Sequence, residues 1–116
     1  MAGHFWRKEI IQPALNSDVE EAVAEQQAIL AKDPKNAKAY FALGTLSHFQ
    51  GEIEQAMQYF QKSIELNPTD AAPHLSLGRL YAVRREYKLA WQHARAAEAL
   101  GANDLVAMLE RYPNLK

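Results

Sequence analysis

Apolar and small side chains recur at intervals of three and four residues over most of this chain, the spacing of one face of an α-helix. The pattern breaks at Gln50-Gly51 and at Asn67-Pro68, so it predicts separate helices joined by short turns. Asp70 is placed to cap the helix after it, and Pro113 is placed to end the last one. The predicted helices cover about residues 18–31, 37–50, 53–66, 70–84, 87–100 and 104–111, with Pro13 expected to interrupt any earlier helix and Asn103 to cap the last.

The helical pattern repeats every 34 residues. When residues 37–70 are laid over residues 71–104, nine positions are identical, where average composition gives about two by chance. These positions are Ala37/Ala71, Leu43/Leu77, Gly44/Gly78, Leu46/Leu80, Glu52/Glu86, Ala56/Ala90, Gln58/Gln92, Leu66/Leu100 and Asp70/Asp104. One period earlier, Glu20, Ala22, Gln27 and Pro34 match Glu54, Ala56, Gln61 and Pro68. Each unit is therefore expected to be a pair of antiparallel helices.

These residues resemble the tetratricopeptide repeat (TPR) family, whose signature places W-x2-L-G-x2-Y, A-x3-F and P within 34 residues. In residues 37–70 the signature positions hold Tyr40, Leu43, Gly44, Ala56, Phe60, Ser63 and Pro68, with Ser47 replacing the first tyrosine. In residues 71–104 they hold Leu77, Gly78, Tyr81, Tyr87, Ala90 and Ala97, with His74, Ala94 and Ala102 as departures. In the first unit Trp6, Ala22 and Pro34 fit, while Glu9 and Ile10 replace Leu-Gly.

The resemblance implies an all-α, right-handed α-α superhelix. We expect residues 1–116 to form one domain: a degenerate repeat at 3–36, full repeats at 37–70 and 71–104, and a C-terminal capping helix at 104–112. Gly44 and Gly78 are expected where the helices of a pair approach closely, opposite Ala56 and Ala90. Phe60 and the leucines are expected to fill the space between successive pairs.

Composition restricts the class of protein. Of the 116 residues 48% are hydrophobic and 23% charged, which favours an ordered chain. The absence of cysteine excludes disulfides, thiolate zinc sites and a cysteine nucleophile. No apolar run predicts a signal peptide or a membrane span, so the default expectation is a cytoplasmic location without membrane insertion.

The sequence contains no arrangement that predicts catalysis, a metal or another cofactor. His4, His48, His74 and His93 have no metal-ligand spacing with one another, and no glycine-rich phosphate loop is present. The neighbouring glutamates lie at the openings of helices, where negative charge is favourable. We therefore expect no enzyme, no cofactor and no metal site.

Charge is distributed unevenly although it sums to −1. Residues 1–36 and 37–70 each carry −2, whereas residues 71–116 carry +3. The basic group Arg79, Arg84, Arg85, Lys88 and Arg95 is either ordinary surface or a site that favours an acidic partner. The sequence pI near 6.4 argues against nucleic-acid binding.

If the geometry of the family applies, the first helix of each pair lines a concave groove. The positions that face into the groove without packing against the core are then Lys38, Phe41, Ala42, Thr45 and Phe49 in one helix, and Ala72, Leu75, Ser76, Arg79 and Val83 in the next. Some family members hold a C-terminal carboxylate with lysine and asparagine there, but Phe41, Thr45 and Ser76 occupy those positions here.

This mainly apolar strip predicts a non-catalytic scaffold or adaptor that binds a partly apolar, acidic segment of another protein. Phe41, Phe49, Leu75 and Val83 would supply the apolar contacts, with Lys38 and Arg79 orienting the acidic flank. The alternative is a self-association module, such as a homodimer, that uses the same surface.

Overall fold

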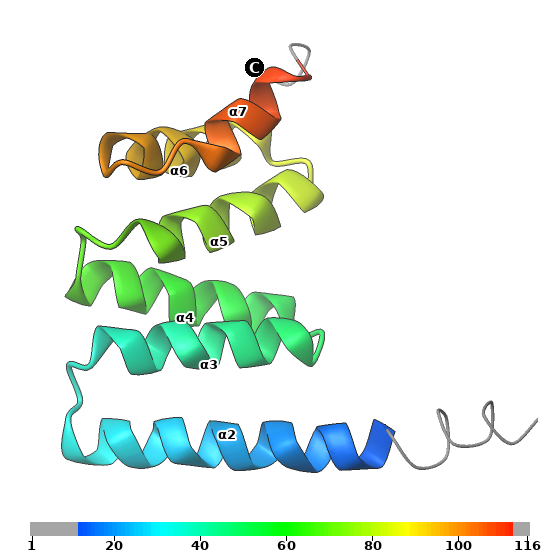
Figure 1. Ribbon diagram of the computed structural model, residues 1–116, viewed down its shortest axis with the longest axis vertical. Helices are drawn as coiled ribbons and strands as arrows, with labels where there is room; N and C mark the ends of the chain where they lie inside the picture. Colours follow the sequence, from blue (N-terminus) through cyan, green and yellow to red (C-terminus); the bar gives the residue numbers. More distant parts are fainter. Residues whose placement is uncertain (1–11, 113–116) are drawn as a thin grey trace, which may run out of the picture.

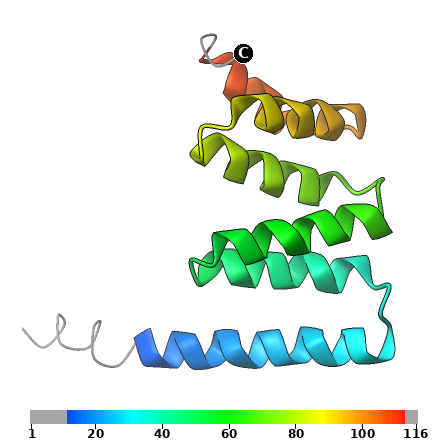
Figure 2. The ribbon, with the colours of Figure 1, turned by 180° about the vertical axis from the view of Figure 1, so that it is seen from behind.

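A computed structural model of the chain describes residues 12–112, with side chains from residue 17. The described part holds helices and no strand. The helices are α2 (Gln12–Lys32), α3 (Ala37–Phe49), α4 (Ile53–Leu66), α5 (Ala71–Val83), α6 (Tyr87–Ala99) and α7 (Asp104–Glu110). They stack in chain order from α2 at one end to α7 at the other (Figure 1), and the reverse view shows the same order (Figure 2). The predicted all-α fold of stacked helices is confirmed.

The predicted bounds of α3 to α7 agree with the structure to within one residue at each end. The start of α2 was predicted wrongly: it begins at Gln12 rather than near residue 18, and Pro13 lies in its first turn instead of interrupting it. Proline is tolerated there because the first N–H groups of a helix have no partner within the helix. The helix expected before Pro13, with Trp6, lies outside the described residues.

Local caps and turns explain where the helices begin. Asp70 has an extended backbone, and its carboxylate accepts a hydrogen bond of 3.0 Å from the N–H of Ala72, as predicted. Asn36 caps α3 in the same way through the N–H of Ala39. The predicted cap at Asn103 is wrong, since its side chain makes no capping hydrogen bond and its backbone, with ψ 9°, lacks the extended conformation of a capping residue.

The turns within the two pairs share a left-handed residue. Gly51 adopts φ +81° between α3 and α4, as its place in the predicted turn suggested. One repeat later, Arg85 adopts φ +63° in the turn between α5 and α6. A side chain with a β-carbon is strained in this conformation, so this turn departs from the local preference of its sequence.

The first helix pair closes around Phe60. This residue of α4 is only 1% exposed, and a β-carbon at Gly44 would lie 2.6 Å from its ring. The ring also packs against Phe41 of α3, with ring centroids 5.5 Å apart. The predicted role of Gly44 in close packing is therefore confirmed, but its partner is the Phe60 ring rather than Ala56.

The second pair is closed differently, because Ala94 stands where Phe60 stands one repeat earlier. A β-carbon at Gly78 would lie 2.5 Å from a methyl group of Leu105, which belongs to α7. It would also lie 3.4 Å from the carbonyl of Ala90, so α5 and α6 approach closely as expected. Helix α7 thus supplies the apolar volume that the second pair lacks.

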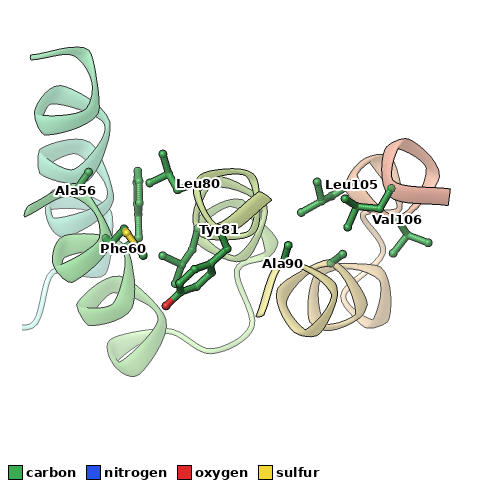
Figure 3. Packing of buried hydrophobic residues seen from close by; sticks show 11 residues of the cluster. Ala56, Phe60, Leu80, Tyr81, Ala90, Leu105 and Val106 are labelled. Carbon is green, nitrogen blue, oxygen red and sulfur yellow. The ribbon is translucent and has the colours of Figure 1, made fainter. Parts of the chain in front are cut away.

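The main cluster of buried side chains runs along the stack from α4 to α7. Phe60 lies beside Leu80 of α5, and Leu105 and Val106 reach into the cluster from α7 (Figure 3). Because the cluster draws on four helices, the two pairs and α7 share one continuous core, as in other helical repeats. No helix in the described part is long and apolar enough to cross a membrane.

Candidate protein-binding face

The residues predicted to line a groove lie on α3 and α5, and we call these ten residues the α3–α5 face. They are Lys38, Phe41, Ala42, Thr45 and Phe49 of α3, and Ala72, Leu75, Ser76, Arg79 and Val83 of α5. Lys38, Thr45, Phe49, Arg79 and Val83 are exposed, and the other five are half-buried. The face therefore combines side chains that belong partly to the core with side chains that are free to make new contacts.

Phe41 and Leu75 are the members tied to the core. Both pack against the main buried cluster, and Phe41 contacts the Phe60 ring. They were expected to be unpacked, and this detail is wrong. Their outer surfaces still add apolar area to the face, but their removal would also disturb the core.

Phe49 and Val83 are the most exposed large apolar side chains of the face. Each is the last residue of its helix, and they occupy the same position in successive repeats. Phe49 is 62% and Val83 80% exposed. Exposed apolar side chains mark an interaction site where they form a contiguous patch, and single ones are common on any protein surface.

The two cations of the face carry unpaired charge. Among the described residues, neither Lys38 nor Arg79 forms an ion pair. The hydroxyl of Thr45 donates to the carbonyl of Phe41 in its own helix, at 3.2 Å, so it is engaged locally. The charged side chains of the face are therefore all cationic.

The basic group around the second repeat divides into paired and unpaired members. Arg84 contacts the carboxylates of Glu54, at the start of α4, and of Glu86. Arg95 pairs with Glu98 and lies over the Trp91 ring, 4.9 Å from its centroid. Arg84 thus links the two repeats, and the charge available to an acidic partner on α5 is that of Arg79.

A contact between two histidines was missed by sequence reasoning. The Nδ1 atoms of His74 on α5 and His93 on α6 are 3.1 Å apart, and the Tyr81 ring stacks on His93. Burial lowers the pKa of His74 below its ordinary 6.5, while Asp70 acts in the opposite direction. Burial also lowers the pKa of His93, and His74 lowers it further. The 34-residue period could have predicted this contact, because it aligns His74 and His93 with Tyr40 and Tyr59 of the preceding repeat.

The histidine pair does not form part of a larger metal-binding cluster in the described residues. No group of three or more histidine, aspartate or glutamate side chains there is arranged to hold a metal ion. The α3–α5 face itself offers exposed apolar side chains and two cations without an ion pair among the described residues.

Comparison with known proteins identifies the repeats. Models of the tetratricopeptide repeat match residues 37–70 and 59–92. The sequence of the chain matches no curated protein.

Two solved structures share the fold. One, described as "MamA RS-1 ArsTM double mutant", has 25% identity and a TM-score of 0.66 over 72% of this chain and 47% of that one. A chain from the "CopN-Scc3 complex" has 20% identity and the same TM-score of 0.66 over 86% of this chain and 59% of that one. This chain thus spans about half the length of the solved chains it matches. The tetratricopeptide repeat is generally a non-catalytic fold through which proteins bind one another, and residues 37–92 of this chain consist of such repeats.

Proposed function

We propose that this chain is a non-catalytic adaptor that holds a segment of another protein on the α3–α5 face. The observation that carries the proposal is the recurrence of exposed apolar side chains, Phe49 and Val83, at one position of two repeats. The unpaired cations Lys38 and Arg79 lie on the same helices. The matching segment is partly apolar with an acidic flank, because buried apolar anchors supply affinity and complementary charge supplies orientation.

We also propose how the chain is divided into repeats. Residues 1–116 act as one array, with repeats at 37–70 and 71–104, a partial repeat before them and α7 as a cap. Leu105 supports the role of α7, since it fills the space over Gly78 in the second pair. A cap of this kind covers apolar surface that the last repeat would otherwise expose.

The experiment compares two matched triple variants as bait for partners from the source cell. The face variant is Phe49→Ala, Val83→Ala, Arg79→Glu, which avoids Phe41 and Leu75 because those side chains pack against the core. The control variant is Ile29→Ala, Leu100→Ala, Lys35→Glu, which changes exposed side chains of the same kinds outside both the face and the basic group of the second repeat. Circular dichroism must first show that both variants keep the native helical content.

We expect proteins captured by the native chain and the control variant to be lost from the face variant. The purified partner should then bind the native chain with an affinity that weakens as salt is raised, because Arg79 contributes through charge. Equal capture by both variants would refute binding at this face.

Self-association through the α3–α5 face is the second candidate. It is favoured by the exposure of Phe49 and Val83, since exposed apolar patches on isolated chains often mark an interface between copies. Light scattering after size-exclusion chromatography distinguishes the two functions. A native dimer that becomes a monomer only in the face variant assigns the face to self-association.

A further inference from the structure

Two successive repeats place different chemistry at the same helix crossing. In the first pair, Tyr40 of α3 and Tyr59 of α4 face one another, with ring centroids 6.2 Å apart and planes inclined by 38°. In the second pair the equivalent residues are His74 and His93, with centroids 5.3 Å apart and planes inclined by 37°. The backbone therefore holds a pair of rings in both repeats, but only the second pair can bind and release protons near neutral pH.

The histidine contact requires that at least one ring be neutral. At a separation of 3.1 Å, one Nδ1–H donates and the other Nδ1 accepts through its lone pair. A first added proton can bind at Nε2 of the donor ring and leave this hydrogen bond intact. A second must bind at the accepting Nδ1, which removes the lone pair and sets two N–H groups and two positive charges against each other.

The surroundings offer little compensation for a second charge. Of the charged groups on the packed elements, Asp70 acts on His74, and its carboxylate already accepts the N–H of Ala72. His93 is influenced by the charge of His74, and its ring is covered by Tyr81, whose hydroxyl accepts a hydrogen bond from Gln61 on α4. Both rings lie partly out of water, which disfavours their charged forms.

The rings also have little room to separate while the helices stay packed. A β-carbon at Gly78, one turn after His74, would lie 3.3 Å from the Cβ of His93. Because α5 and α6 cross so closely here, the repulsion between two charged rings acts on the packing between the helices rather than on a mobile surface group.

We propose that His74 and His93 form a proton-sensitive contact that opens the packing of α5 on α6 when the surroundings become acidic. The first pair, with Tyr40 and Tyr59 in the equivalent positions, keeps its packing under the same conditions. This behaviour belongs to the repeat itself and does not depend on whether the α3–α5 face binds a partner.

Urea unfolding at pH 7.5 and pH 5.5, followed by circular dichroism, tests the proposal on the full chain. An unfolded histidine has a pKa near 6.5, so each ring that stays neutral in the folded protein raises the unfolding equilibrium constant up to about tenfold over this interval. The sign follows from proton binding: the unfolded chain binds more protons, so the folded form loses stability as the pH falls below 6.5. We expect the two histidines together to raise the unfolding equilibrium constant at least fivefold between pH 7.5 and pH 5.5.

The matched variant is His74→Tyr/His93→Tyr, which copies the ring pair of the first repeat. In this variant most of the rise in the unfolding equilibrium constant between pH 7.5 and pH 5.5 should be lost. The His48→Gln variant, changed at an exposed site on α3, should retain it. A double variant with the same pH dependence as the native chain would overturn the proposal.

Two measurements on the native chain make the test independent of how well the variant packs. In an NMR titration of the imidazole protons, both rings should titrate below pH 6.5; midpoints at or above 6.5 for both would refute the proposal. Hydrogen exchange at pH 5.5, corrected for the intrinsic rate, should show larger opening in α5 and α6 than in α3 and α4. Uniform opening over the four helices would contradict a contact located in the second pair.

Discussion

Substitution of Gly44 by alanine tests how the first helix pair is packed. The new β-carbon would lie 2.6, 2.7 and 3.0 Å from three carbons of the Phe60 ring, whereas ordinary contacts begin near 3.4 Å. The ring must therefore move by about 0.8 Å, the difference between 3.4 and 2.6 Å. It is 1% exposed and bounded on another side by Phe41, so it has little space into which to move.

Two opposing effects determine the size of the change. Overpacking of this kind costs about 1–3 kcal/mol, while replacing glycine by alanine inside a helix contributes up to about 1 kcal/mol in the other direction. We expect Gly44→Ala to lower the free energy of unfolding by about 1–2 kcal/mol. The assay is urea denaturation at pH 7.5, monitored by circular dichroism at 222 nm.

A second substitution isolates the contact from other effects of alanine. A Phe60→Leu background removes two of the three ring carbons near the new β-carbon, Cε1 and Cζ, and the δ-methyl groups of leucine can rotate away from it. Alanine at position 44 should then be neutral or stabilising by up to about 1 kcal/mol. The coupling between the two sites should then be about 1–2 kcal/mol. If Gly44→Ala stabilised the native chain as much as the Phe60→Leu chain, the ring would not be confined as the structure indicates.

Three further predictions use the same unfolding assay. Arg85→Gly should stabilise the chain by about 0.5–1 kcal/mol, because glycine adopts φ +63° without strain; a loss of stability would refute this reading of the turn. Asp70→Ala should cost about 1 kcal/mol through the lost cap, whereas Asn103→Ala should change little, and equal losses at both sites would contradict the observed difference in capping. Arg84→Ala should cost less than about 1 kcal/mol at low salt and still less at 1 M salt, since its ion pairs are partly exposed; a loss that salt leaves unchanged would point to packing instead.

The arrangement of the helices was largely predictable from the sequence because its causes are local. The spacing of apolar side chains, the cap at Asp70 and the turn at Gly51 act within a few residues, and the 34-residue period then extends the result to the next pair. The start of α2 was mistaken at Pro13, where proline is compatible with both a helix start and a helix break.

The positions of the candidate face were predictable from the period, but which of its side chains are packed and which are exposed was not. The sequence placed Phe41 and Phe49 on one helix without distinguishing them. The structure shows that Phe41 packs against Phe60 while Phe49 is 62% exposed. Burial depends on what the neighbouring helices cover, which the spacing within one helix does not specify.

Contacts between distant residues were decided by the tertiary structure. Gly44 was recognised as a close approach, but only the packed helices identify the Phe60 ring as the group it faces. Likewise His74 and His93, on different helices, meet at 3.1 Å because α5 and α6 cross closely at Gly78. The sequence by itself determined the helices and their period, since these follow from local free energies along the chain. The rings, charges and exposed side chains that meet across helices depend on crossing distance, which only the packed array establishes.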